Sequence, residues 1–191
     1  MSTIFVEGFK LLTNAGFDNK IDINYKELKR LTELMRKDSV AFVSSHKSYL
    51  DLVIFLIVMK KHDLPLPFIF SGDNLNIPIF GNIFKNSGII FIKRNSKDEY
   101  LYKVVLKYFI SWLRKKKYHF IWSIEGGRSR TGKILNPKMG ILKYLSDVDY
   151  IKYVPVSIMY DLIPDLDYMA VEGYGKDKKQ ETVYDTISYF Q

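Results

Sequence analysis

Short apolar runs that are typical of buried strands alternate along this chain with longer segments of helical periodicity. Strands that alternate with helices usually form an α/β domain, because each helix returns the chain to a parallel strand. We therefore predict an α/β fold, a mostly parallel mixed sheet flanked by helices. Pro155 has no N–H to donate, so its strand is expected at an edge or with an irregularity. The predicted strands are 40–43, 68–70, 89–92, 119–124 and 154–158, with a sixth within 166–174.

The segments between these runs carry the helical signals. The clearest predicted helix covers 97–117, because seven apolar side chains form one stripe along it. They are Leu101, Val104, Val105, Tyr108, Phe109, Trp112 and Leu113. Further helices are predicted at 3–12, at 49–61, at 138–146, from Asn24 or Asp22 to Lys37, and from Pro78 onward. The 191 residues predict one domain, with a helical segment at 1–37, an α/β core at 38–174, and a charged linker with a truncated helix at 175–191.

Composition narrows the chemistry that this chain can perform. There is no cysteine, which excludes disulfides, thiolate metal sites and cysteine nucleophiles. The three histidines lack metal-ligand spacing, so no metal site is predicted. A net charge of +8 favours anionic partners, namely phosphorylated substrates or anionic lipid. Nucleic acid is not expected, because the basic residues do not gather on one recognition helix. No apolar run reaches the roughly 20 residues of a spanning helix, so any membrane contact would be peripheral.

A histidine and a carboxylate lie where the first predicted strand passes into a helix, in the stretch Ser44-Ser-His46-Lys-Ser48-Tyr-Leu-Asp51. This junction is where α/β proteins commonly place reacting groups. Ser48 and Asp51 fit a capping pattern, with serine at the N-cap and an acid three residues later. If the loop folds back over the helix end, Asp51 can hold one imidazole nitrogen of His46 and leave the other as a base. Alternatively, Asp51 is only a cap and His46 only a loop residue.

A second polar stretch, Gly127-Arg-Ser-Arg-Thr-Gly-Lys133, follows the fourth predicted strand and matches most of a phosphate-binding P-loop. The residue after Lys133 is Ile134, so the hydroxyl that would hold magnesium is missing. Pro137 also falls where the P-loop helix should run. A nucleoside triphosphatase is therefore not predicted. The glycines and cations still suit a phosphate group, although a solvated basic turn explains them equally well.

Arg94 follows the third predicted strand directly. In a parallel sheet, the residues after each strand gather at one edge, so Arg94, His46 and the 127–133 stretch are expected there together. A base beside several cations indicates a site where a hydroxyl on a phosphorylated molecule loses its proton.

Four short motifs occur along the chain in a fixed order. They are His46-Lys-Ser-Tyr-Leu-Asp51, Gly88-Ile-Ile-Phe-Ile-Lys-Arg94, Glu125-Gly-Gly-Arg-Ser-Arg130 and Val154-Pro-Val156. This series resembles the four motifs of the glycerolipid acyltransferases, over about residues 24–174. The extended form of the third motif, with Thr131-Gly-Lys133 and then Pro137-Lys138, is most similar to the glycerol-3-phosphate and dihydroxyacetone-phosphate acyltransferase branch. Members of that branch are usually longer on both sides, so a fragment, a minimal form or an inactive remnant is expected.

The resemblance implies a monotopic enzyme on the cytoplasmic face of a membrane. Its reaction would move a fatty acyl group from acyl-CoA or acyl-carrier protein to the sn-1 hydroxyl of glycerol 3-phosphate, the first step of phospholipid synthesis. No cofactor beyond the thioester co-substrate is implied. By resemblance His46 is the base and Asp51 its partner. The implied acceptor site comprises Arg94, Glu125, Gly126, Gly127, Arg128, Ser129 and Arg130, to which we add Lys133 on charge alone.

The expected reaction is direct acyl transfer, with Asp51 stabilising the imidazolium of His46. Backbone amides at the helix start after Ser48 are predicted to serve as donors to the thioester oxyanion. One alternative keeps this chemistry but takes dihydroxyacetone phosphate or a lysophospholipid as the acceptor. Another is a basic membrane-binding module without catalysis.

Overall fold

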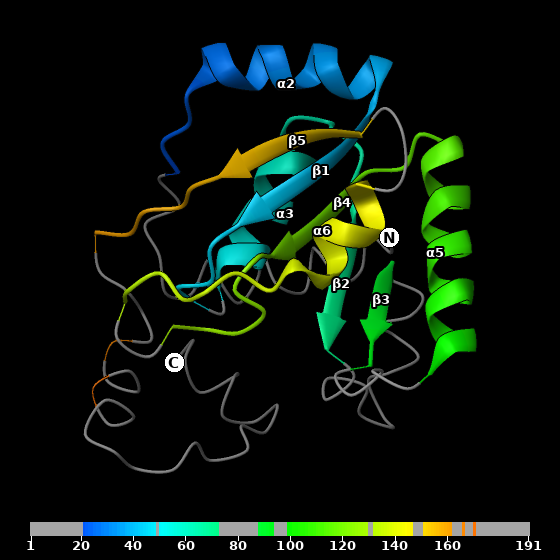
Figure 1. Cartoon of the computed structure of the whole chain (residues 1–191). Helices are drawn as coiled ribbons and strands as arrows, with labels where there is room; N and C mark the ends of the chain where they lie inside the picture. The colour runs from blue at the N-terminus through cyan, green and yellow to red at the C-terminus, as the bar shows by residue number, and fades with distance from the viewer. Residues whose placement is uncertain are drawn as a thin grey trace.

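The computed structural model describes residues 21–48, 50–72, 88–93, 99–129, 132–146 and 151–161, together with Leu166 and Ala170. Helices and strands alternate through most of this part of the chain (Figure 1). The helices are α2 (Tyr25–Lys37), α3 (Leu50–Lys61), α5 (Tyr100–Lys115) and α6 (Met139–Ser146). The strands are β1 (Ser39–Ser44), β2 (Phe68–Gly72), β3 (Ile89–Ile92), β4 (Phe120–Ser123) and β5 (Ile151–Val156).

The five strands form one sheet in the order β3-β2-β4-β1-β5, and every pair among them is parallel. The predicted α/β fold is therefore confirmed. Pro155 lies on β5 at the end of this order, as its missing N–H predicts. Because all strands run the same way, the residues that follow them meet at one carboxyl edge. β1 has β4 on one side and β5 on the other, so three chain segments meet beside His46.

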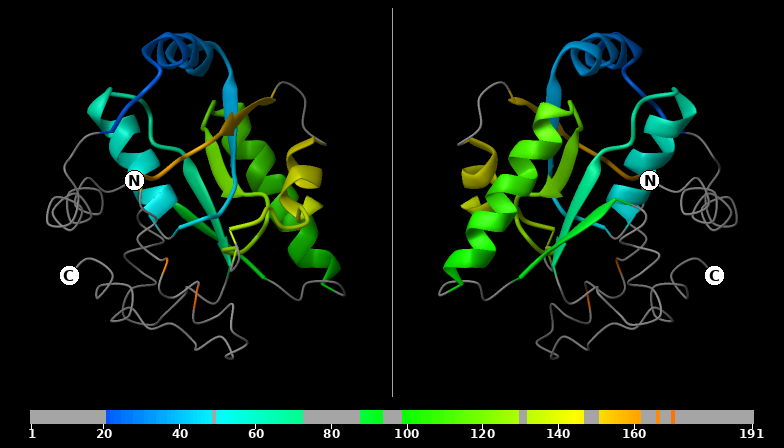
Figure 2. Two further views of the ribbon diagram at one scale, coloured as in Figure 1. Left: turned by 90° about the vertical axis from the view of Figure 1, so that its left-hand side faces the viewer. Right: turned by 90° about the vertical axis from the view of Figure 1, so that its right-hand side faces the viewer.

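Side chains alternate between the two faces of the sheet, and helices cover both faces (Figure 2). On β1, Phe42 packs with α2 and α3, whereas the preceding Ala41 packs with α5 and α6. Phe42 lies edge-on to Phe55 of α3, with 4.9 Å between the ring centroids. On the other face, Phe70 stacks on Phe120 at 5.7 Å. Two apolar layers therefore cover the sheet, and this sheet carries the polar loops at its carboxyl edge.

The outer face of α5 is apolar, whereas helices that cover a sheet usually have a polar outer face. The helix forms as predicted, but six members of the apolar stripe are exposed, with Leu101 at 74% and Tyr108 at 76%. The side chains that enter the core are Leu106, Ile110 and Leu113. At about 100° per residue, the six exposed side chains span an arc of about 140° on the side of α5 away from the sheet. This helix therefore carries a second apolar face in addition to its core face.

Local sequence signals placed the described elements well. Asn24 caps α2 by accepting the N–H of Glu27 at 3.2 Å, so Asn24 rather than Asp22 begins this helix. The predicted helix at 3–12, the helix from Pro78 and the 175–191 tail lie outside the described residues. Of the predicted sixth strand, only Leu166 and Ala170 are described, and both are helical.

Candidate active site

The start of α3 places Asp51 close to the loop that carries His46. The Asp51 carboxylate accepts the N–H of Ser48 at 3.0 Å, and the Ser48 hydroxyl accepts the N–H of Leu50 at 3.1 Å. The Asp51 contact is the half of the predicted capping box in which the acid accepts the serine N–H, whereas the serine hydroxyl accepts the N–H of Leu50 rather than that of Asp51. Oδ2 of Asp51 also accepts the N–H of Lys47 at 2.7 Å. The cap thus folds the loop back over the helix end and brings His46 toward the same carboxylate.

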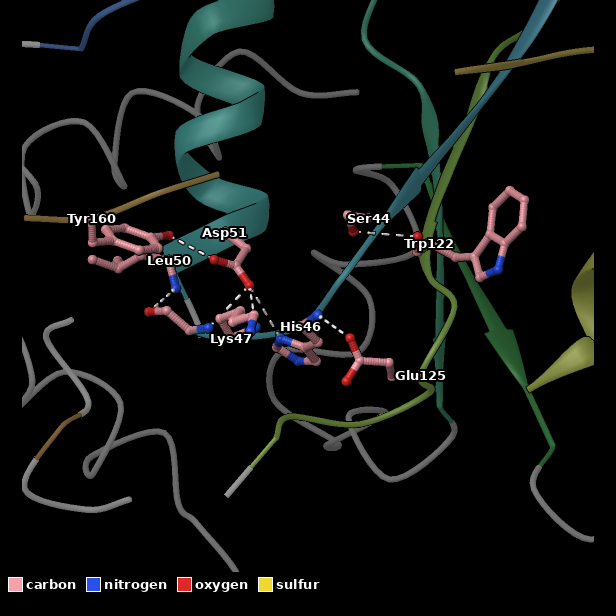
Figure 3. Close-up of polar contacts among 9 residues, drawn as sticks. Ser44, His46, Lys47, Leu50, Asp51, Trp122, Glu125 and Tyr160 are labelled. Carbon is pink, nitrogen blue, oxygen red and sulfur yellow. Dashed lines mark hydrogen bonds and ion pairs between the residues drawn. The ribbon is translucent and has the colours of Figure 1, made fainter. Parts of the chain in front are cut away.

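His46 and Asp51 face one another at the carboxyl edge of β1 (Figure 3). Nδ1 of the imidazole lies 3.6 Å from Oδ2 of the carboxylate, and the histidine side chain keeps 28% of its surface exposed. This separation suits an ion pair and is longer than a hydrogen bond. Catalytic pairs are often loose without substrate and tighten when it binds. Asp51 therefore both caps α3 and faces an accessible imidazole.

Asp51 is an ionised carboxylate in a buried position, only 6% exposed. Burial alone would raise the pKa of this group, but four contacts outweigh it and hold the pKa below its ordinary value. In decreasing order, they come from the His46 imidazole, the Ser48 N–H, the Tyr160 hydroxyl and the Lys47 N–H. A negative charge is thus kept beside His46, where it can stabilise an imidazolium.

Tyr160 joins the site although the sequence did not single it out. It lies four residues after β5, and its hydroxyl donates to Oδ1 of Asp51 at 2.7 Å (Figure 3). The only signal in the sequence was its place shortly after the fourth motif. That signal was too weak to choose Tyr160 from the 14 tyrosines of the chain.

Glu125 connects the His46 loop to the segment after Lys133. Its Oε1 accepts the N–H of His46 at 3.2 Å, and its Oε2 accepts the N–H of Leu135 at 3.1 Å. The side chain is 3% exposed. Both carboxylate oxygens therefore already hold backbone amides, so in this structure Glu125 positions the loops. Direct contact with substrate stays a prediction for this residue.

Ser129 also forms its hydrogen bonds with other parts of the protein. It is fully buried, its N–H donates to the His46 carbonyl at 2.9 Å, and its hydroxyl donates to the Lys133 carbonyl at 2.6 Å. The Lys47 ammonium further donates to the carbonyl of Gly132. The His46 loop and the loop after β4 are thus joined through both backbone and side chains, which fixes the position of the imidazole.

The burial of Arg128 is inconsistent with a uniformly solvated basic turn. Its side chain is buried, whereas Lys133 on the same loop is exposed. A guanidinium is seldom removed from water without a partner for its charge, because an isolated buried charge is costly. Gly126 is exposed and has a φ of +67°, which permits the sharp turn after β4. Part of the positive charge of this turn is therefore removed from solvent.

Two predicted site residues, Arg94 and Arg130, lie outside the described residues. The end of β3, just before Arg94, shares the carboxyl edge with His46 but lies three strand positions from β1. At the usual strand spacing, this separation is about 14 Å. Lys93, which is described, pairs with Glu99 at 2.7 Å. The predicted gathering at one edge is therefore confirmed for the strand ends, while the place of both arginines stays a prediction.

The predicted oxyanion donors are the backbone amides at the start of α3 after Ser48, of which that of Tyr49 is not described. The N–H of Leu50 donates to the Ser48 hydroxyl at 3.1 Å, and that of Asp51 donates to the Ser48 carbonyl at 3.3 Å. The N–H groups of Lys47 and Ser48, just before these residues, bind the Asp51 carboxylate. These amides already have partners within the protein, and their role as oxyanion donors stays a prediction.

Comparison with known proteins agrees with the geometry. The sequence profile of the family described as Acyltransferase matches residues 22–159. The chain is 37% identical over 180 residues to a protein named putative acyltransferase plsB1 from Mycobacterium tuberculosis (strain ATCC 25618 / H37Rv), which covers 91% of this chain and 29% of that protein. It is 36% identical over 173 residues to a glycerol-3-phosphate acyltransferase from Pseudoalteromonas translucida (strain TAC 125), covering 87% of this chain and 21% of the relative.

The matched region holds the whole described sheet together with His46, Asp51 and the loop after β4. The chain spans less than a third of the length of these curated relatives. The family resemblance seen in the four motifs is confirmed by the matching profile and relatives. This chain belongs to the Acyltransferase family, among relatives of the glycerolipid acyltransferases.

Proposed function

We propose that this protein transfers a fatty acyl group from acyl-CoA or acyl-carrier protein to the sn-1 hydroxyl of glycerol 3-phosphate. The observation that carries the proposal is the His46–Asp51 pair, with Nδ1 and Oδ2 3.6 Å apart at the carboxyl edge of the sheet. The name of the 36% identical relative supports glycerol 3-phosphate as the acceptor. Transfer to this acceptor would begin phospholipid synthesis.

The proposed reaction needs one base and a thioester. Nε2 of His46 takes the proton from the acceptor hydroxyl, and the oxygen attacks the thioester carbonyl carbon. The tetrahedral intermediate collapses, the carbon–sulfur bond breaks, and the leaving thiolate takes the proton from the imidazolium. Asp51 stabilises the imidazolium between these two transfers, because its charge lies on the Nδ1 side. The steps use only side chains of this chain and its two substrates.

The loop after β4 supports a phosphorylated acceptor. Arg128 and Lys133 are two of its described cations, and Arg128 is next to Ser129, whose N–H binds the His46 carbonyl. A guanidinium binds phosphate through charge-assisted and often bidentate contacts. A phosphate bound to this loop would keep the hydroxyl of the same small molecule near His46.

The test is transfer of a labelled acyl chain from acyl-CoA to glycerol 3-phosphate by the purified protein. His46→Ala is expected to abolish transfer while the protein stays folded, since the loop imidazole adds little to the core. Asp51→Asn should leave a small residue of activity, because the amide keeps the shape without the charge. His62→Ala is the matched control, since His62 follows α3 at its far end. Near-normal turnover of His46→Ala would reject the proposed base.

Other acceptors are compared in the same assay. Dihydroxyacetone phosphate and a lysophospholipid replace glycerol 3-phosphate as acceptors of the labelled acyl chain. A lower KM for either than for glycerol 3-phosphate would change the assigned acceptor and keep the mechanism. Vesicle binding without any acyl transfer would favour the non-catalytic membrane module instead.

The outer face of α5 supports a place on an anionic membrane surface. Its exposed apolar side chains include Tyr108, Phe109 and Trp112, and the latter two rings stack at 6.3 Å. Tyrosine and tryptophan favour the boundary between lipid and water. Six cations lie between residues 99 and 117, against one acid, Glu99. This combination suits anionic headgroups, which attract each nearby Lys or Arg by about 1 kcal/mol.

The cations at the end of α5 lie next to Lys37 at the end of α2. A depression of about 190 Å³ there is lined by Lys37, Asp38, Ser39, Arg114, Lys115 and Lys117. No helix in the described residues is long and apolar enough to cross a membrane. The protein would therefore lie with α5 along the headgroups, while its reacting groups sit at the carboxyl edge.

Sedimentation with vesicles containing phosphatidylglycerol tests this orientation. Tyr108→Ser combined with Trp112→Ser should weaken binding about tenfold or more, because two amphipathic rings leave the contact. Salt should release part of the protein by screening the cations. Tyr25→Ser is the control, since Tyr25 is an exposed aromatic on α2. Unchanged binding of the double variant would show that α5 does not contact the lipid.

A further inference from the structure

The Asp51 carboxylate accepts three hydrogen bonds, and one of them comes from a distant part of the chain. Two backbone amides hold Oδ2, and the hydroxyl of Tyr160 donates to Oδ1 at 2.7 Å. Tyr160 lies 109 positions after Asp51 along the chain. The helix cap would form without it, because the amides come from the same loop. The tyrosine contact therefore adds something that capping does not require.

The geometry of the carboxylate indicates what that contribution is. The amides anchor one oxygen, which alone would leave the group free to turn about that anchor. A second contact on the other oxygen fixes the plane of the carboxylate. Oδ2 then keeps its lone pairs directed toward both the amides and Nδ1 of His46, 3.6 Å away (Figure 3).

We propose that Tyr160 is a positioning residue for acyl transfer, which acts on His46 through Asp51. This inference rests on the proposed function, since it assigns a partner to the same base. By fixing the carboxylate plane, the phenol keeps the negative charge facing the imidazole while the proton moves on and off Nε2. It also attaches the segment after β5 to the start of α3. The site therefore depends on three neighbouring segments, those of β4, β1 and β5.

Tyr160→Phe removes the hydroxyl and keeps the ring. We expect kcat to fall about tenfold, the loss of one hydrogen bond to a charged group, with little change in the KM for glycerol 3-phosphate. Tyr153→Phe is the matched control, because Tyr153 is a half-exposed tyrosine within β5, paired in register with Ala41 rather than with the loop beyond Ser44. It should keep its kcat. Equal losses in both variants would overturn the proposal.

A double-mutant cycle separates positioning from general stability. If Tyr160 acts through the Asp51 charge, Tyr160→Phe should cost little further activity in an Asp51→Asn background. Additive losses would show that Tyr160 acts independently of Asp51. Thermal melts of all four proteins in the cycle show whether a lost fold contributes to either loss.

A second readout does not depend on activity. The chain has three histidines, so the ring signals of His46 can be assigned by NMR through comparison with His46→Ala. The described ionisable groups beside it include Asp51 on α3, Glu125 after β4 and the adjacent Lys47. If Tyr160 positions Asp51, Tyr160→Phe should change the chemical shifts of the His46 ring, and Tyr153→Phe should not. Unchanged His46 ring signals in Tyr160→Phe would overturn the positioning role. If the signals change but no variant transfers acyl groups, the coupling holds and the proposed function fails.

Discussion

The backbone N–H of His46 donates to Oε1 of Glu125, 3.2 Å away, and this contact joins the loops after β1 and β4. The other oxygen of Glu125 accepts the N–H of Leu135. A buried carboxylate that serves two amides cannot be replaced by an amide side chain without loss. The NH2 group of glutamine would meet one of the two N–H donors.

Glu125→Gln is therefore expected to lower the free energy of unfolding by about 1–3 kcal/mol, the cost of a buried donor left without an acceptor. Turnover should fall as well, because the His46 loop loses its anchor. Chemical denaturation and the acyl-transfer assay measure the two effects. Glu27→Gln is the control, since Glu27 forms an exposed ion pair with Arg30 and its loss should cost less than about 1 kcal/mol. Equal stability of the two variants would contradict the structural role of Glu125.

The Arg128 guanidinium is expected to hold the acceptor phosphate. Arg128→Lys should raise the KM for glycerol 3-phosphate about tenfold, because an ammonium lacks the planar fork. Arg128→Ala should raise it further, provided that a melt shows the protein folded. Lys133→Ala should have the smaller effect, since Lys133 is exposed and its contact is solvated. The measurement varies glycerol 3-phosphate and acyl-CoA separately. A rise confined to the acyl-CoA constant would assign Arg128 to the donor.

Gly126 is expected to tolerate no side chain. Its φ is +67°, and a Cβ added there would lie 2.8 Å from Cγ of Lys138. Gly126→Ala should lower the free energy of unfolding by about 1–3 kcal/mol from backbone strain alone. Gly140→Ala is the control, because Gly140 lies in α6 with no heavy atom near the added Cβ. That change should stabilise the helix by up to about 1 kcal/mol. Equal midpoints in chemical denaturation would refute this account of the turn.

His119 is expected to make the fold sensitive to acid. Burial lowers its pKa from 6.5 to about 4, and its Nδ1 accepts the N–H of Val40 at 3.1 Å. The unfolded chain thus takes up a proton at a higher pH than the folded protein. The free energy of unfolding should therefore fall as the pH drops from about 6.5 to about 4.

Asp51 affects the free energy of unfolding at a lower pH than His119 does. Its pKa is below the ordinary 3.8 in the folded protein, so its contribution is lost only as the pH falls further. His119→Asn retains an acceptor oxygen near the position of Nδ1 and removes the titration. Denaturant titrations at several pH values should show a flatter profile for this variant between pH 6.5 and 4. An unchanged slope would mean that another group carries the dependence.

Much of this protein was readable from local patterns in the sequence. The spacing of Ser48 and Asp51 predicted the cap, since capping depends only on neighbouring backbone groups. Pro155 predicted that its strand lies at an edge or carries an irregularity, because a residue without an N–H cannot bond to both neighbours, and β5 ends the described strand order. The alternation of strands and helices predicted a parallel sheet, and with it one edge for the motif residues. These inferences need nothing beyond backbone hydrogen bonding and side-chain periodicity.

Other features depended on how distant segments meet. The order β4-β1-β5 brings Glu125 and Tyr160 to opposite sides of the His46 loop, although they lie 79 and 109 positions from their partners. No local pattern encodes such pairs, because the sheet order decides them. The orientation of α5 is similar, since the helix has two apolar faces and only packing on the sheet selects Leu106, Ile110 and Leu113 for the core. Sequence periodicity thus determined the elements and the chemistry of the motifs. Tertiary packing decided which residues support His46 and which apolar face stays in solvent.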